Sequence, residues 1–267
     1  MKSPGFFDDA AMVRRVHRER VMALGGGRAL LLMAAHPVAF EGFFASTGTL
    51  DDPYSRLRRT AEVLEAITFG PADRARVMTR RVRALHRKVR GTLPAPAGRF
   101  PAGTAYAATD PELLLWILAS LADSNLLIYD RYVRSLSRDE REAYWQDFKV
   151  IGRQFGLRLR DLPENIEAFD AYTRHLLAGP DLAVTDRARE LSIEIVLHPP
   201  VPLTVRPLVE LANFITVGLL PARLRAEYGL RWDPARQLAL IGGAEYARRV
   251  LLPLMPARVR YLERSAA

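Results

Sequence analysis

Residues 80–91 read RRVRALHRKVRG, a basic segment with a single histidine, His86, set among apolar residues. At about 3.6 residues per turn, one side of a helix here carries the uncharged positions and the histidine: Thr79, Val82, His86 and Val89. The pattern predicts a helix over residues 72–91 with the imidazole of His86 pointing inward. An inward imidazole is most often a core histidine with satisfied hydrogen bonds, and the alternative is a ligand to a metal or to haem.

The length and composition of the chain predict one folded domain. A chain of 267 residues with 49% hydrophobic residues can bury a sizeable core. We expect a single domain over residues 1–267, with its core at about 20–255 and a basic, frayed tail at 256–267.

The charge balance favours an anionic partner. Lys and Arg number 39 against 30 Asp and Glu, for a net charge of +9, and the pI is near 10.2. Nucleic acid, anionic lipid and carboxylate ligands all suit this balance, but an arginine-rich composition can equally reflect a GC-rich genome, with no partner involved. No nucleic-acid-binding motif accompanies the charge, so nucleic acid is not expected as the partner.

The sequence contains no cysteine. This excludes disulfides, zinc–thiolate sites, thiolate-ligated haem and covalent attachment of c-type haem. Any haem would be held non-covalently, by histidine.

The apolar segments indicate a cytoplasmic protein. The first twenty residues lack the continuous apolar core of a signal peptide. The runs 29–40 and 113–121 are too short to span a bilayer and read as buried helices. Peripheral contact with a membrane stays open.

Turn and capping signals divide the chain into helices and leave no convincing alternating strand pattern. Gly25-Gly26-Gly27 predicts a break or kink between two helices, with close helix packing as the use of the glycines. The Pro/Gly segment 92–104 predicts a loop. The expected helices cover residues 8–34, from 37 onward, 51–70, 72–91, 112–136, 137–155, 162–177, 184–197, 208–220 and 235–252. The sequence therefore predicts an all-α fold of about ten or more helices in an orthogonal, globin-like packing.

Two residues near the predicted second helix are candidates for a site. His36 precedes Pro37 and so lies at a bend, where it could bond free backbone groups or act as a second candidate haem ligand behind His86. Glu41 lies in the apolar string VAFEGFFA, where an unpartnered carboxylate would be costly to bury.

Further candidates lie on the next helices. Arg56, Arg59 and Thr60 share a helix face with Val63 and suit a carboxylate or propionate, although such arginines more often lie on a solvated face. Trp116, in the most apolar helix, would wall a site.

Five blocks of sequence resemble the DUF2236 family, also described as the MpaB-type or rubber-oxygenase catalytic domain, which includes the latex clearing proteins. They occur in the family's order: ALLLMAAHPVAFEG (29–42), DPYSRLRRTAEVLEAITFG (52–70), RVRALHRKVRG (81–91), YAATDPELLLWILASLADS (106–124) and LPARLRAEYGLRW (220–232).

The resemblance implies haem b and a set of site residues. Its characterised members are b-type haem oxygenases that cleave carbon–carbon double bonds of isoprenoid chains, and His86 takes the place of the proximal iron ligand. The family's Arg-x-x-Lys-Thr pattern matches residues 56–60 with Arg59 in place of lysine, so a distal lysine on iron is in doubt. Arg56, Arg59 and Thr60 would bind propionates or polarise dioxygen. Glu41 would act as general base.

The resulting hypothesis is an oxygenase or oxidase that uses haem and dioxygen on a lipophilic substrate, with an isoprenoid alkene as the example. One alternative is a non-catalytic helical protein that binds an anionic partner, either a membrane surface or nucleic acid. Another is a haem protein for sensing or electron transfer. Steep loss of binding with salt would mark the first alternative, and turnover of a lipophilic substrate would exclude the second.

Overall fold

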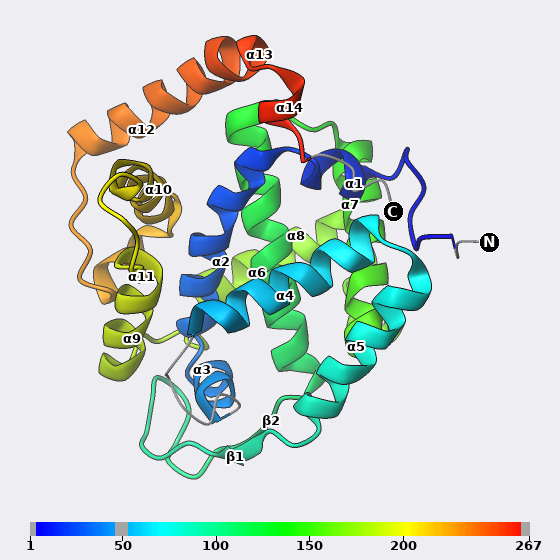
Figure 1. The fold of residues 1–267 in the computed structure, drawn as a ribbon. Coiled ribbons are helices and arrows are strands. Elements are labelled where there is room, and N and C mark those ends of the chain that lie inside the picture. Colours follow the sequence, from blue (N-terminus) through cyan, green and yellow to red (C-terminus); the bar gives the residue numbers. More distant parts are fainter. Residues whose placement is uncertain (1–3, 46–52, 263–267) are drawn as a thin grey trace.

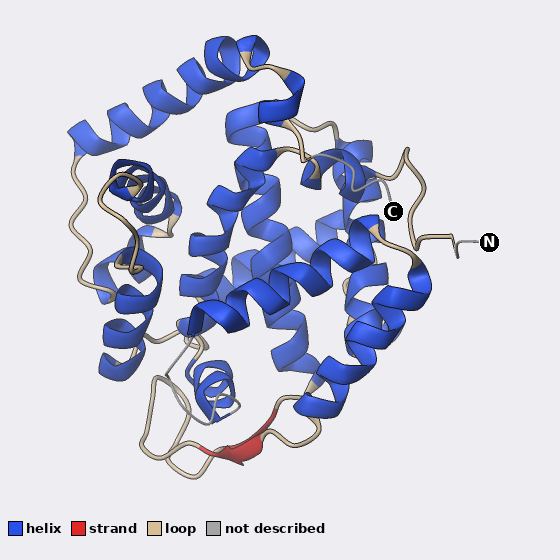
Figure 2. Cartoon of the chain, viewed as in Figure 1, coloured by secondary structure: helices blue, strands red, loops and turns tan. Residues whose placement is uncertain are grey.

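The fold is all-α, as predicted (Figures 1 and 2). The computed structural model describes residues 4–45 and 53–262, and in these ranges one two-stranded hairpin accompanies the helices. Helices cross one another at large angles and do not form a parallel bundle (Figure 1). In chain order the elements are α1 (Met12–His17), η1 (Arg20–Leu24), α2 (Gly25–Ala34), α3 (Pro37–Ala45), α4 (Pro53–Phe69), α5 (Ala72–His86), β1 (Arg90–Thr92), β2 (Ala105–Ala107), α6 (Pro111–Ile128), η2 (Tyr129–Val133), α7 (Arg138–Phe155), η3 (Leu159–Asp161), α8 (Ile166–Ala178), α9 (Asp186–Leu197), α10 (Arg206–Leu219), α11 (Ala222–Glu227), α12 (Pro234–Tyr246), η4 (Ala247–Leu251), α13 (Leu252–Leu254) and α14 (Ala257–Arg260).

The triple glycine begins α2 and does not break a helix, so the predicted kink at this point is wrong. Gly25 has a helical backbone with φ −72°, and the helix is interrupted between α1 and η1 instead, where Glu19 has an extended backbone with ψ 120°. The glycines allow close packing, as expected: a Cβ on Gly27 would lie 2.6 Å from Oγ1 of Thr216 on α10, and one on Gly25 would lie 3.3 Å from Oδ1 of Asn125 on α6. Helix α2 can therefore lie directly against α6 and α10.

The bend between α2 and α3 is confirmed. The two helical segments meet at 108°, and His36 lies between them, directly before Pro37. The carbonyl of His36 accepts the amide of Phe40, and Nδ1 of His36 accepts the amide of Ala39 at 3.3 Å. Histidine thus satisfies backbone groups at the start of α3, where proline prevents helix α2 from continuing.

Helix α5 ends at His86, five residues earlier than predicted. Gly91 lies in β1 opposite Tyr106 of β2, and a Cβ on Gly91 would lie 2.6 Å from the Tyr106 hydroxyl. The glycine therefore serves the approach of a tyrosine ring and not a helix cap. The hairpin was missed because three-residue strands carry too little alternating pattern to be recognised.

Helix α6 passes through the centre of the molecule, as its apolar sequence predicts (Figure 1). Its N-cap Asp110 accepts the amide of Glu112, and Pro111 occupies the first turn. With η2 the helix runs over Pro111–Val133, with a mean hydropathy of 1.4, so it is longer than its most apolar run indicated. By length and composition alone, this helix could cross a membrane, and so could the bent pair formed by residues 20–34 and 37–43. However, 56% of the most apolar part of the Pro111–Val133 helix is buried within the protein. Long apolar helices that are largely buried are typical of protein cores.

Capping signals located the next three helices well. Ser137 and Glu140 form the predicted capping box at the start of α7, and Gly156 ends it with φ +114°. The side chains of Asn165 and Thr185 cap α8 and α9.

The C-terminal segment is docked on the N-terminal part of the chain, so the predicted frayed tail is wrong for residues 256–262. Arg260 makes a 2.7 Å ion pair with Glu19, which is 3% exposed, and the amide of Leu262 donates to the carbonyl of Arg18 at 2.8 Å. Residues 263–267 lie outside the described ranges. The buried carboxylate of Glu19, directly before η1, explains why a basic C-terminal segment is held here.

Arg28 makes a buried polar junction between three helices. It lies on α2 and is 4% exposed. Its guanidinium donates to the carbonyl of Leu219 on α10 at 2.9 Å and to Oγ of Ser124 on α6 at 2.8 Å, and it lies 2.7 Å from the carboxylate of Asp123. This arrangement joins α2, α6 and α10 through one charged group.

Candidate functional site

His86 is the last residue of α5 and is half-buried, with its Nδ1 atom inside the protein. The face predicted for this helix is correct: Thr79 is 3% exposed and Val89, just beyond the helix end, is 7% exposed. The hydroxyl of Thr79 donates a hydrogen bond to the carbonyl of Ala75. Because this hydroxyl is satisfied within the helix, the face of the helix that carries it is effectively apolar. The imidazole thus lies at the rim of the core, at the point where the chain leaves the helix.

A small apolar cluster lies next to the end of α5. It consists of Val38 from α3, Val89 and Leu93 from the segment after His86, and Tyr106 from β2. The cluster fastens the residues that follow His86 to α3, the helix that carries Glu41. The segment after His86 and helix α3, which are far apart in the sequence, are therefore in contact in the fold.

Glu41 is paired, which resolves the cost of placing a carboxylate on an apolar helix. Its side chain is 16% exposed and lies 3.2 Å from Nη1 of Arg187 on α9. Burial raises the pKa of Tyr106, the charge of Glu41 raises it further, and Arg187 opposes the change. Arg187 and Tyr106 are neighbours of the candidate Glu41 that the sequence did not indicate, since they lie on different elements from Glu41 and no local spacing connects them.

The candidates on α4 lie on its exposed side. Arg59 and Thr60 are exposed, and the helix is buried through Val63, Ala66 and Ile67. The sequence placed Val63 on the same helix face as the arginines, but Val63 is buried. The face of α4 that packs on the protein is therefore rotated from the face expected. The side chain of Arg56 lies outside the part of the chain that the structure describes. Helices α4 and α5 diverge from their junction near Gly70 (Figure 1), and α3 lies near their open end.

His36, the second candidate ligand, is 8% exposed and neutral. Burial lowers its pKa from 6.5 to about 4; Asp181 and Asp110 oppose the change, and Arg99 adds to it. Its ring lies 5.2 Å from that of Phe100. Since Nδ1 of His36 accepts a hydrogen bond from the backbone amide of Ala39 in α3, the observed role of His36 is to stabilise the bend.

The lowered pKa of His36 predicts that stability falls in acid. Between pH 6.5 and 4 the unfolded chain takes up a proton at this residue and the folded chain does not, so unfolding is favoured as pH falls. We expect the loss of unfolding free energy between about pH 7 and pH 5 to be smaller by roughly 2 kcal/mol in His36→Gln. Urea denaturation at the two pH values measures this. His198→Gln, an exposed histidine on the loop after α9, is the control and should keep the wild-type profile; an unchanged His36→Gln profile would contradict the prediction.

Trp116 lies deep in a separate part of the core. It is 1% exposed and packs in a cluster with Leu31, Leu32 and Tyr228, and its Nε1 has no hydrogen-bond partner among the described residues. Leu113, one turn before Trp116, packs against both this cluster and the one with Val89. Trp116 is thus joined to the His86 region through one intervening leucine.

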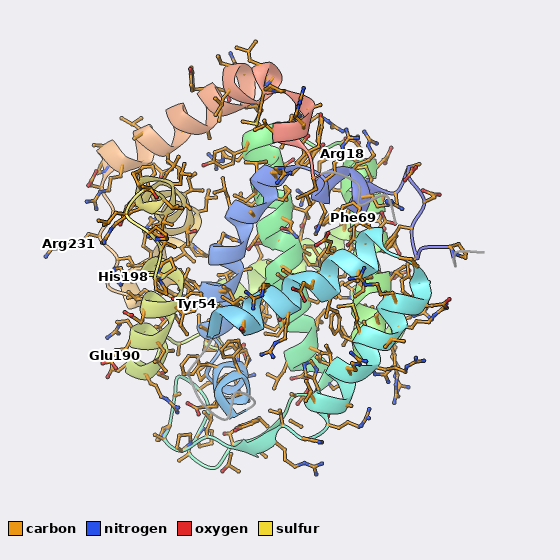
Figure 3. The ribbon with its side chains drawn as sticks, in the orientation of Figure 1. Arg18, Tyr54, Phe69, Glu190, His198 and Arg231 are labelled. Carbon is orange, nitrogen blue, oxygen red and sulfur yellow. The ribbon has the colours of Figure 1, made fainter. Side chains whose placement is uncertain are left out.

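Two cavities of similar volume lie away from these residues. One, of about 470 Å³, lies between α1, the end of α4 and the C-terminal segment, and Arg18 and Phe69, both labelled in Figure 3, line it. The other, of about 490 Å³, is lined by residues at the start of α6 and by Asp161. Neither is lined by a predicted site residue, so these two cavities do not identify the site.

The comparisons with known proteins agree with the residue blocks. Residues 13–251 match the family described as "ER-bound oxygenase mpaB/B'/Rubber oxygenase, catalytic domain". The chain belongs to this family. Two relatives, from Mycobacterium tuberculosis and Mycobacterium bovis, are each 29% identical over 190 residues, which cover 69% of this chain and 69% of theirs, and both are uncharacterised. No solved structure matches the chain.

The donor atoms of this rubber-oxygenase family member suit haem better than a bare metal ion. Within residues 4–45 and 53–262, no group of three or more His, Asp or Glu side chains could hold a metal ion. His86 instead offers one imidazole, next to a surface with many arginines. A single imidazole would suit iron that is otherwise ligated by the nitrogens of a porphyrin, and guanidinium groups would suit the propionates.

Proposed function

We propose that this chain is an oxygenase that uses non-covalently bound haem b and dioxygen on a lipophilic substrate, an isoprenoid alkene being the type expected. The observation that carries the proposal is His86, whose Nδ1 is buried at the end of α5 in a member of an oxygenase family. Histidine is the fitting ligand here because the chain has no cysteine.

The residues of this chain have separate tasks in the proposed reaction. Bound haem supplies the activation of dioxygen. His86 holds it from the end of α5. Arg59 and Thr60 offer N–H and O–H donors from the exposed side of α4, suited to propionates or to charge that develops on oxygen, and Arg56 belongs to the same proposal through the sequence pattern alone.

Glu41 is proposed as the base that withdraws an allylic proton. Its carboxyl group lies 3.2 Å from Nη1 of Arg187 and is 16% exposed, so it is fixed in position near the surface of α3, and a positioned carboxylate is a group that can accept a proton from a substrate. The apolar cluster of Val38, Val89 and Tyr106 borders the same helix and excludes water from one side of it. Trp116 contributes to the apolar wall behind this cluster.

The test is the visible absorption spectrum of the purified protein, with a pyridine haemochrome assay and turnover of isoprenoid alkenes under dioxygen. We expect a Soret band, b-type haem near one per chain, and oxygen-dependent cleavage products. Absence of a Soret band, before and after addition of hemin, would overturn the proposal. Bound haem without turnover of any lipophilic substrate would indicate sensing or electron transfer instead.

Glu41→Gln should retain haem and lower turnover by roughly tenfold to a hundredfold, because the amide keeps the size of the side chain and removes the base. Steady-state rates and the Soret absorbance measure the two effects. Glu190→Gln, which changes an exposed carboxylate on α9, is the matched control and should behave as wild type. Unchanged turnover in Glu41→Gln would remove Glu41 from the site.

A further inference from the structure

The exposed apolar side chains of this protein are concentrated in its C-terminal helices. Among the described residues, twelve of the fifteen large hydrophobic side chains that are exposed lie in residues 203–262, so they form a regional feature and not a general property of the surface. Six of the twelve lie on α10, α12 and α13, and the other six lie on η4, α14 and the adjoining loops. Helix α12 runs along one edge of the molecule from beside α10 to α13 (Figure 1). Leu203, Leu254 and Leu238 are the most exposed, at 80%, 79% and 70%.

Helix α12 is attached to the protein along a narrow line. Leu240 and Ala244 are its buried residues, and Leu238 and Ile241 face outward. Helix α10 contacts it through Gly218, whose Cβ would meet Trp232 and Leu240. Most of the apolar surface of α12 is therefore available to a partner, which is unusual for a helix in a folded chain.

The same segment is strongly cationic. Residues 203–262 contain nine arginines and four acidic residues, without lysine. Arg231 and Arg258 are exposed, and Figure 3 shows Arg231 reaching outward from the molecular edge. These two arginines lie beside the apolar helices, Arg231 in the loop before α12 and Arg258 on α14. A segment that exposes both leucines and arginines suits the interface of a bilayer, where acyl chains receive the leucines and anionic headgroups receive the guanidinium groups.

We propose that the surface formed by α10, α12, η4, α13 and α14 docks on a membrane that contains anionic phospholipid. Two observations favour lipid over a second copy of this chain. The most exposed leucines lie at chain turns, Leu203 before α10 and Leu254 at the end of α13, which suits insertion between headgroups better than a flat interface. A twofold dimer would also bring the same cationic surface against itself. The proposal concerns a surface distinct from the His86 region and does not depend on haem.

Co-sedimentation with vesicles of phosphatidylcholine, with and without phosphatidylglycerol, tests the proposal on the full chain. We expect binding to the anionic vesicles, weakened by salt. Leu238→Glu with Leu254→Glu should lower the bound fraction about fivefold or more, since two charges replace inserted apolar side chains. The matched control is Val77→Glu with Leu159→Glu, two apolar residues exposed on α5 and η3, which should bind as wild type.

Circular dichroism and gel filtration accompany both double variants. Equal binding of wild type and Leu238→Glu/Leu254→Glu, or no binding of wild type to anionic vesicles, would overturn the proposal. A wild-type dimer that this variant converts to monomer, without vesicle binding by either, would identify a second copy as the occupant and overturn it as well.

Discussion

His86→Ala is expected to abolish haem retention. The substitution removes the imidazole whose Nδ1 is buried at the end of α5, and alanine cannot replace it as an iron ligand. Because His86 is the last helical residue and only half-buried, the loss of its side chain should leave the helical fold intact. The Soret absorbance, the haemochrome assay and hemin titration measure the loss, and circular dichroism checks the fold.

Two histidine variants serve as controls for this result. His36→Ala should leave haem binding largely unchanged, because its Nδ1 is bonded to the backbone of α3. His198→Ala removes an exposed histidine and should also bind as wild type. Loss of haem in His36→Ala with retention in His86→Ala would reverse the assignment of the ligand.

Arg28→Met is expected to lower the free energy of unfolding by about 3 to 5 kcal/mol, because it leaves buried partners of a charged group unsatisfied. The variant keeps most of the side-chain volume but removes the donors to the Leu219 carbonyl and Ser124, and it leaves the carboxylate of Asp123 beside an apolar group. Urea denaturation followed by circular dichroism measures the change.

The control for Arg28→Met is an exposed arginine that pairs with an aspartate on its own helix. Arg76 lies 3.4 Å from Asp73 in the first turns of α5, with both side chains largely exposed, so Arg76→Met should change the free energy of unfolding by less than about 1 kcal/mol. Similar effects of the two substitutions would show that the junction at Arg28 contributes no more than a surface pair.

The all-α fold and most helix boundaries followed from local sequence, because capping and helix termination depend on residues within one turn. Ser137 with Glu140, Asp110 with Pro111, and Gly156 mark helix ends through bonds and backbone angles that need no distant partner. The pattern around His86 likewise predicted which face of α5 would be buried. The family was also recognised from blocks of sequence, and its match covers residues 13–251.

Where local signals compete with distant contacts, sequence reasoning failed. Gly91 looked like a helix cap, but its function is to admit the ring of Tyr106 from the opposite strand. The three glycines at 25–27 looked like a break as well as a packing site, but α2 begins there with helical geometry, and only the close packing was predicted correctly, at Gly25 on α6 and Gly27 on α10. In both cases the deciding atom comes from another element, and a glycine carries no information about what approaches it.

By itself, the sequence determined the fold class, the family and the candidate ligand His86, since each depends on residue types, short spacings or ordered motifs. The tertiary structure alone decided the partner of Glu41, which is Arg187 on α9, the junction of Arg28 with α6 and α10, and the gathering of exposed leucines and arginines on the C-terminal helices. These depend on which helices pack together, and the packing arises from the summed burial of many side chains, which no local pattern encodes.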